Sequence, residues 1–394
     1  MEKHFSRADT VKFQCALFCL ALAAFTQMYA LQGVLPHVSQ DWMISASDAA
    51  LTVSFAMAGV ACGVVPSAWA GDRYGKLRCL KISLAVSVTT GFLVPLMPNY
   101  QILLGVRFIS GMALAAIPVL AIAYVRETFN GRIAALGAGA YIAGMAAGGA
   151  GGRVIAGPLA PMLGWRGAVL VAALASLIIA LVFYWGIPRL AQQHERSAAS
   201  QRSRFKKALG TITLWRLYAQ GFLMTGIHVG MYNYIAFRLQ EAPFFLAPGI
   251  ASLVFFAYFA GTISSRFGAA WMERFGYQAT MALGGTTLLV GLVGMLSAQL
   301  WLVITGLVVY TAGFFVTQTA AVTTIGNEAD STFRSQTSAA FTICFYLGSG
   351  VLGWALGLVF EARGWTVMSI CMGGMILLCL TLSLLIRPRS GPAG

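Results

Sequence analysis

Long runs without charged residues recur along this chain and predict membrane-spanning helices. The runs occupy 13–40, 49–71, 82–106, 108–125, 133–152, 167–188, 217–237, 242–265, 275–327, 335–360 and 364–386. The run 275–327 is too long for one span of about 20 residues, and we divide it at its polar break, Ser297-Ala298-Gln299. The runs are continuous rather than alternating and exceed the roughly 10 residues of a barrel strand. The pattern therefore predicts twelve helices.

Composition supports an integral membrane protein. Of 394 residues, 58% are hydrophobic and 10% are charged, against roughly 25% charged in an average soluble domain. A water-soluble fold cannot hide so much apolar surface, and disorder requires low hydrophobicity. The first run is far longer than the apolar core of about 7–15 residues in a signal peptide, so we expect it to remain as helix 1 of an all-α protein in the lipid bilayer.

The distribution of Lys and Arg predicts the orientation. With the N-terminus inside, 21 of the 26 basic residues fall on the inner side and three, Arg166, Arg238 and Arg363, on the outer side. This bias places both termini in the cytoplasm of an inner-membrane protein. It also accounts for the net charge of +14, so no nucleic-acid partner is needed to explain it.

An internal repeat divides the chain into two similar parts. Asp72-Arg73-Tyr74-Gly75 has a counterpart in Glu273-Arg274-Phe275-Gly276, 201 residues later, and Gly164-Trp165 in Gly364-Trp365, 200 residues later. We expect an N-terminal six-helix half at 1–188, a basic cytoplasmic linker at 189–210 and a C-terminal six-helix half at 211–394. Parallel halves with a site near the membrane midplane are typical of transporters.

The loop after helix 2 carries a family motif. Asp72-Arg73-Tyr74-Gly75-Lys76-Leu77-Arg78 resembles the signature of the major facilitator superfamily, although Ala68 replaces its first Gly and Leu77 interrupts the basic run. The resemblance implies twelve helices in two parallel six-helix pseudo-repeats. It also implies a cytoplasmic gate, for which the candidate residues are Asp72, Arg73, Gly75, Lys76, Arg78, Glu127, Glu273 and Arg274.

Two arginines lie within spans, where a charge is costly and marks a functional candidate. Arg107 stands where many proton-linked exporters of this superfamily carry a basic residue; the alternative is a side chain that extends to the outer surface. Arg153 follows a glycine-rich stretch of helix 5, where Gly149 and Arg153 depart from the exporter pattern. Glycines at this density allow close helix contact, which we expect between helices 5 and 11.

Helix 7 indicates a branch of the superfamily. Its Asn233-Tyr234-Ile235 and Arg238-Leu239, taken with Arg153, resemble the acriflavine-sensitivity branch, which implies export of small organic molecules or drugs. The superfamily resemblance makes helices 1, 4, 7 and 10 the expected cavity walls. The substrate-cavity candidates are Gln27, Gln32, Tyr141, Arg153, Tyr232, Asn233, Tyr310 and Gln318.

Proton coupling has few candidate residues, because no Asp or Glu lies deep in a span. His228, near the middle of helix 7, has a side chain whose ordinary pKa suits proton exchange; the alternative is a histidine hydrogen-bonded between helices. The other candidates are Asp41, Asp48 and His37 near the outer mouth, and Arg107 as a fixed charge.

These observations predict a secondary transporter that exports small organic molecules in exchange for protons, as a monomer, without a metal or another cofactor. Uptake of a metabolite is the first alternative. A membrane-embedded sensor or enzyme is the second, but the chain carries no metal cluster, nucleophile–base pair or nucleotide-binding loop in a suitable context. We therefore do not expect an enzyme.

Overall fold

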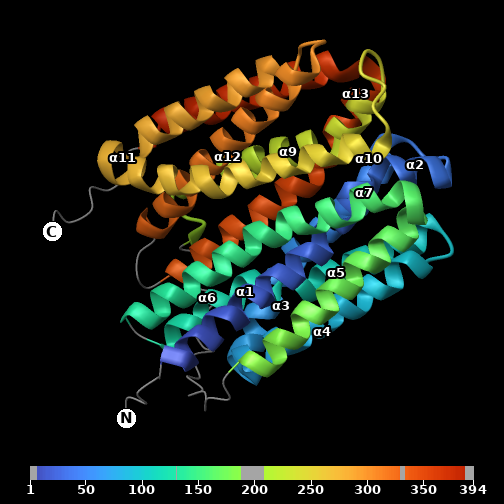
Figure 1. The fold of residues 1–394 in the computed structure, drawn as a ribbon. Coiled ribbons are helices and arrows are strands. Elements are labelled where there is room, and N and C mark those ends of the chain that lie inside the picture. The colour runs from blue at the N-terminus through green and yellow to red at the C-terminus, as the bar shows by residue number, and fades with distance from the viewer. Residues whose placement is uncertain (1–6, 130, 188–207, 329–332, 387–394) are drawn as a thin grey trace.

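The computed structural model describes residues 7–129, 131–187, 208–328 and 333–386, and all of its elements are helices (Figure 1). The expected linker at 189–210 lies mostly outside these ranges. The N-terminal part begins with α1 (Arg7–Tyr29), a 3₁₀ turn η1 (Ala30–Val34) and α2 (Leu35–Trp42). There follow α3 (Ala46–Tyr74), α4 (Lys76–Leu93), η2 (Val94–Leu96), α5 (Tyr100–Leu114), α6 (Ala116–Thr128) and α7 (Gly131–Gly186).

The C-terminal part repeats this plan with longer continuous helices. It consists of α9 (Ile212–Gln240), α10 (Pro248–Ala251), η3 (Ser252–Ala257), α11 (Tyr258–Gly294), α12 (Leu300–Glu328) and α13 (Arg334–Leu384). The polar break at 297–299 separates α11 from α12, as predicted. Spans 3 and 4 meet at 97–99, and Arg107 lies inside the fourth span, as expected.

Twelve membrane crossings result from these helices. Eight segments of the described chain are long and apolar enough to span a membrane. Three of them contain a sharp bend at a glycine, in α7 at Gly164, in α11 at Gly276 and in α13 at Gly364, and each provides two crossings. The more polar α9 is the remaining span. The predicted twelve-helix all-α fold is therefore confirmed.

The repeat found in the sequence also appears in the backbone. Gly75 and Gly276 have φ of 91° and 75°, and Gly164 and Gly364 have φ of 67° and 76°. L-residues with side chains rarely adopt this region, which explains the same residue at corresponding turns of both parts. We call the end of the bundle with the turns at Gly75 and Gly276 the Gly75 end, and the opposite end the Gly164 end.

The close helix contacts at glycines are not those that the sequence suggested, which were between helices 5 and 11. Gly144, Gly148 and Gly152 of α7 lie against the carbonyl groups of Phe18, Leu22 and Thr26 in α1. In the C-terminal part, Gly348 of α13 lies against Phe222 of α9. Helix 5 thus packs on helix 1, and helix 11 on helix 7. The expected contact between helices 5 and 11 is wrong, because small residues permit close approach without specifying the partner helix.

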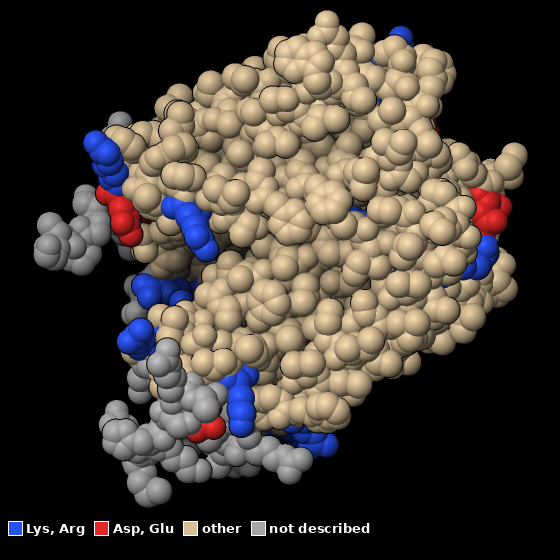
Figure 2. Space-filling model, viewed as in Figure 1, with Lys and Arg blue, Asp and Glu red and all other residues tan. Residues whose placement is uncertain are grey.

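The two six-span parts contact each other in the middle of the bundle and at the Gly164 end. There α13 packs along α3, and η3 packs on α7; in Figure 1 the parts diverge toward the Gly75 end. Figure 2 shows Lys, Arg, Asp and Glu gathered at the two ends, with a broad belt almost free of charge between them. An apolar belt bounded by charges is what a bilayer requires of a spanning protein.

Candidate functional site

Arg153 is the centre of a buried cluster where the two six-span parts meet. Its side chain is 1% exposed, and Nε donates to Oε1 of Gln32 at 2.7 Å while Nη1 donates to the carbonyl of Gly149. Its Cζ lies 4.1 Å from the ring centroid of Tyr29 and 4.4 Å from that of Tyr258. Within the described ranges, no Asp or Glu forms an ion pair with Arg153.

Gln32 connects Arg153 to the C-terminal part. Its Nε2 donates to Oδ1 of Asn233 at 2.6 Å, and Asn233 Nδ2 donates to the carbonyl of Gly353 at 3.2 Å. Gln32 lies in η1, where the α-helix is interrupted. Pro36 lacks the N–H that would bond to the carbonyl of Gln32 in a continuous helix, so the local sequence explains the break that positions this side chain. A hydrogen-bond chain therefore crosses from α7 through η1 to α9 and α13.

His228 lies beside this cluster among aromatic rings. It is 2% exposed, and its ring stacks on Phe314 with centroids 3.6 Å apart and planes 7° apart. The same ring lies 4.9 Å from Tyr232 and 5.4 Å from Tyr258. Among the described residues neither ring nitrogen has a hydrogen-bond partner, so the alternative of a histidine hydrogen-bonded between helices is not supported.

Tyr232 and Tyr310 complete the polar edge of the aromatic cluster. The hydroxyl groups of Tyr232 and Thr311 are hydrogen-bonded at 2.7 Å. The Tyr310 ring lies parallel to that of His228 at 6.1 Å, and its hydroxyl has no partner within the described chain. A buried polar atom without a hydrogen bond costs about 1–3 kcal/mol. The unpartnered atoms of His228 and Tyr310 therefore point to a ligand-binding region.

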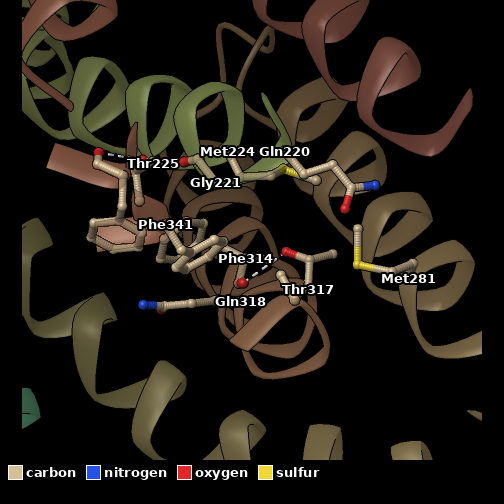
Figure 3. Close-up of a pocket in the computed structure, with 11 residues that line it drawn as sticks. Gln220, Gly221, Met224, Thr225, Met281, Phe314, Thr317, Gln318 and Phe341 are labelled. Atoms are coloured by element: carbon tan, nitrogen blue, oxygen red, sulfur yellow. Dashed lines mark hydrogen bonds between the residues drawn. The ribbon is translucent and has the colours of Figure 1, made fainter. Parts of the chain in front are cut away.

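A small cavity adjoins this region on the side of the Gly75 end. Residues of α9, α11, α12 and α13 line it, among them Gln220, Thr225, Phe314, Thr317 and Gln318 (Figure 3). Phe314 forms part of its wall and also stacks on His228. The cavity thus places the predicted Gln318 near the central cluster, although on the other side of Phe314 from Arg153.

Arg107 has a different environment from Arg153. Its side chain is 2% exposed, so it does not extend to the outer surface. Nε donates to the carbonyl of Thr52 at 2.9 Å, and Nη2 to the carbonyl of Met28 at 2.7 Å. These bonds fasten α5 to α1 and α3 inside the N-terminal part. The guanidinium therefore holds three helices of the N-terminal part together, and among the described residues its hydrogen bonds stay within that part.

Two further predicted cavity residues lie apart from the cluster. The Gln27 side chain is buried against Gly91 of α4, and its Oε1 has no partner among the described residues. Tyr141 is buried on α7, twelve residues before Arg153 and closer to the Gly75 end. Neither side chain contacts Arg153 or His228 in this conformation. Of the eight predicted cavity residues, the structure brings Gln32, Arg153, Tyr232, Asn233 and Tyr310 together.

The signature motif forms an ion cluster at the Gly75 end. Lys76 Nζ lies 2.7 Å from Oε1 of Glu127 and 3.5 Å from Oδ1 of Asp72. All three residues belong to the N-terminal part. Arg73 lies over the ring of Tyr74 at 5.6 Å, and Arg78 lines an open groove between α3, α4 and the fourth span.

The repeated turn of the C-terminal part carries the other two gate candidates. Arg274 lies over the ring of Phe275, 5.1 Å from its centroid, and Glu273 is exposed beside it. Within the described ranges, neither residue forms an ion pair with the first motif. In this conformation the two motifs therefore lie on separate parts, without a bond between them.

The outer candidates for proton coupling lie at the Gly164 end. Asp41 Oδ2 is 2.5 Å from Nη1 of Arg166 and accepts a hydrogen bond from Trp165 Nε1 at 2.9 Å, all within the N-terminal part. His37 is partly buried, and its Nδ1 has no partner among the described residues. Asp48 lies in the first turn of α3, where Ser45 caps the helix.

Sequence reasoning missed the residue that connects the two parts at this end. Glu361, at the bend of α13, accepts hydrogen bonds from the backbone N–H of Ser47 at 2.6 Å and from its hydroxyl at 3.0 Å. A carboxylate at a helix N-terminus also interacts favourably with the helix dipole. Glu361 therefore holds α13 to the start of α3. It ends a charge-free run in the sequence, which suggested only a helix end.

The family assignment follows from comparison with known proteins. The model of the Major Facilitator Superfamily matches residues 17–350, and the chain belongs to this superfamily of membrane transporters. It is 29% identical over 381 residues to the inner membrane transport protein YnfM of Escherichia coli (strain K12), covering 95% of this chain and 89% of that protein. It is 26% identical over 376 residues to the uncharacterized MFS-type transporter YybF of Bacillus subtilis (strain 168), covering 94% and 92%.

The fold is also that of a solved transporter. The crystal structure of a bacterial homolog to the human lysosomal transporter Spinster, in an inward-facing and occupied conformation, superposes with a TM-score of 0.81. It covers 98% of this chain and 100% of that chain at 13% identity, so the likeness concerns the fold alone. Membership of the superfamily, rather than this likeness of fold, identifies the chain as a multi-pass membrane protein and a secondary transporter.

Proposed function

We propose that this protein exports small organic molecules from the cytoplasm by proton antiport, and that the cluster around Arg153 and His228 is its transport site. The observation that carries the proposal is the origin of the cluster's residues: Arg153, Gln32 and Tyr29 come from the N-terminal part, whereas His228, Asn233 and Tyr258 come from the C-terminal part. A site made by both parts opens to alternate sides when they rock against each other.

The proposed direction rests on charge and on motif resemblance. The basic residues gather at the Gly75 end, which the positive-inside rule makes cytoplasmic, and the parts are joined at the opposite end through Ser47 and Glu361. The conformation is then closed to the outside. Export is favoured by the resemblance of helix 7, taken with Arg153, to the acriflavine-sensitivity branch, and by the many aromatic and few polar groups of the site, which suit a largely apolar substrate.

His228 is the proposed proton-coupling residue. It is the one titratable side chain of the central cluster whose ordinary pKa lies near neutrality, and its ring shares two neighbours, Tyr232 and Tyr258, with Arg153. Protonation of His228 would add a second positive charge beside Arg153. Proton and substrate would therefore act on one cluster made by both parts, which allows their movements to be coupled.

The test uses inverted membrane vesicles with an acidic interior and a panel of aromatic carboxylates, amines and uncharged analogues. We expect accumulation of at least one class, driven by the pH gradient, in the unmodified protein. His228→Gln should remove gradient-driven accumulation while gradient-independent exchange persists. Arg126→Gln, an exposed charge loss at the Gly75 end, is the control. Exchange without any gradient-driven accumulation by the unmodified protein would refute proton coupling.

The same vesicles separate export from uptake. An exporter accumulates its substrate in inverted vesicles with an acidic interior, whereas a proton symporter accumulates it in right-side-out vesicles with an acidic exterior. Accumulation only in the second preparation would establish uptake in place of export. If His228→Gln remains driven by the gradient but His37→Gln does not, the coupling residue is at the outer mouth.

A further inference from the structure

We propose that the Arg153 cluster selects an organic anion, a carboxylate joined to a flat aromatic or conjugated body. This inference rests on the transport function proposed above for the same site and adds the charge and shape of the substrate. It follows from three features of the described residues: a buried cation without a counter-charge, unused hydrogen-bonding groups beside it, and aromatic rings around both.

The charge balance of the membrane interior favours an anion. All nine described acidic residues lie at the ends of spans: Asp9, Asp72, Glu127, Glu273 and Glu328 toward the Gly75 end, and Asp41, Asp48, Glu241 and Glu361 toward the Gly164 end. Arg153 therefore lacks an acidic partner within the described chain. Charged side chains inside membranes usually pair with an opposite charge or face a cavity. A substrate carboxylate supplies that charge, whereas a substrate cation would be repelled.

The guanidinium of Arg153 keeps donors available for such a group. Its protein hydrogen bonds use Nε and Nη1, and none from Nη2 occurs among the described residues. Arginine donors match the planar geometry of a carboxylate, and the resulting hydrogen bonds are charge-assisted. Both nitrogens of His228 and the hydroxyl of Tyr310, each buried and unpartnered, offer further polar contacts to the same molecule.

The surrounding rings define the shape of the body attached to the carboxylate. Tyr29 and Tyr258 lie against the guanidinium at 4.1 and 4.4 Å. Tyr258 in turn lies 5.4 Å from His228 and 5.4 Å from Phe315. Aromatic side chains prefer stacked or edge-to-face partners. A flat conjugated molecule would find stacking and edge-to-face partners in these rings, with its charged end toward Arg153 and its body toward the rings.

Arg107 provides an internal contrast that argues for a specific role of Arg153. Both arginines are deeply buried, but Arg107 bonds only to backbone carbonyl groups of its own six-span part. Arg153 contacts residues of both parts, including the rings of Tyr232 and Phe255 at 5.5 and 5.9 Å. A transported substrate must contact both parts as the conformation changes. Arg153 lies where such contacts are made, whereas Arg107 bonds within one part only.

The test measures binding to the purified full-length protein in detergent, without a gradient. The probes are benzoate, cinnamate and 2-naphthoate, each compared with its uncharged carboxamide and with an ammonium analogue of the same ring. Ligand-induced shifts of the unfolding temperature and calorimetric titration report binding. We expect the carboxylates to bind more tightly than both analogues. Arg153→Gln should weaken carboxylate binding roughly 10- to 100-fold, and Arg153→Lys, which keeps the charge, should retain the preference for carboxylates.

The outcomes separate this inference from the proposed function. Equal or tighter binding of the amides or ammonium compounds, a carboxylate preference that persists in Arg153→Gln, or failure of every carboxylate to bind overturns the inference. Arg126→Gln controls for loss of one positive charge, and the temperature of unfolding without ligand reports whether Arg153→Gln is folded. If Arg153→Gln does not fold, the comparison of the three charge classes on the unmodified protein decides the inference. Anion binding without gradient-driven transport would refute proton coupling alone.

Discussion

Removing the negative charge of Glu361 should open the Gly164 end. The Glu361 carboxylate accepts two hydrogen bonds from Ser47 at the N-terminus of α3, at 2.6 and 3.0 Å. Hydrogen bonds to charged groups contribute about 1.5–3 kcal/mol each, but Glu361 is exposed, and the Gln side chain keeps one accepting oxygen. We therefore expect Glu361→Gln to cost the closed conformation about 1–2 kcal/mol in total. Such a change alters a two-state ratio about 5- to 30-fold.

Pulsed electron paramagnetic resonance can measure this change directly. Met43 and Phe245 are 91% and 74% exposed and lie at the Gly164 end on different six-span parts. Spin labels at Met43→Cys and Phe245→Cys, on a background without the seven native cysteines, report the distance between the parts. We expect the long-distance population to rise relative to the short one in Glu361→Gln. Glu241→Gln removes a carboxylate from the same end without touching Ser47 and should leave the distribution unchanged.

A second variant tests whether the effect passes through Ser47. Ser47→Ala removes the hydroxyl bond and keeps the backbone N–H, so it should shift the distribution in the same direction by a smaller amount. Residues in contact give non-additive effects when both are changed, and the double variant should therefore shift less than the sum of the two. An unchanged distance distribution in Glu361→Gln, with folding intact, would refute the role of Glu361 in closure.

Four further changes test other parts of the structure. In Gly148→Ala the new methyl group would lie 2.6 Å from the carbonyl oxygen of Leu22. This contact should lower the free energy of unfolding by about 1–3 kcal/mol and with it the unfolding temperature. Gly139→Ala, with open space around it, is the control and should leave the unfolding temperature unchanged. Arg107→Met should destabilise the protein in thermal unfolding more than Arg107→Lys, since it removes both bonds to backbone carbonyls; equal stability of the two would contradict the fastening role. Asp72→Asn should leave the amount of folded protein in the membrane unchanged but reduce transport strongly, and normal flux at normal expression would refute the proposed gate. Met162→Cys, exposed at the Gly164 end, should react with a membrane-impermeant maleimide added outside intact cells; labelling only after lysis would reverse the topology.

The spans and their turns could be predicted because they depend on local properties of the chain. A long apolar run identifies a spanning segment in lipid whatever surrounds it. Similarly, Gly75 and Gly276 mark turns whose backbone has positive φ. The buried positions of Arg153 and His228 agree with their places within predicted spans. These predictions required no knowledge of which helices become neighbours.

Partners across the interface could not be predicted for the opposite reason. Tyr29, Tyr258 and Phe314 are aromatic residues in apolar runs, and nothing in their own segments distinguishes a ring against a guanidinium from a ring against lipid. Glu361 is likewise one of several acids at helix ends, and its bond to Ser47 spans 314 residues. Similarly, the glycines of α7 suit any close helix, so their period indicates contact but not whether α1 or α13 provides it.

The close packing of α1 on α7 determines what can move during transport. Gly144, Gly148 and Gly152 follow the carbonyl groups of Phe18, Leu22 and Thr26 at the same four-residue interval, so the two helices run as one rigid rod. Arg153 follows Gly152 on α7, and Gln32 lies in η1 directly after α1, so both belong to the N-terminal part. We expect their mutual bond to persist in a rocking motion. The bond from Gln32 to Asn233 belongs to two bodies and must break. A bound molecule would therefore keep its contacts with the N-terminal part during transport, while its contacts with the C-terminal part are broken and replaced.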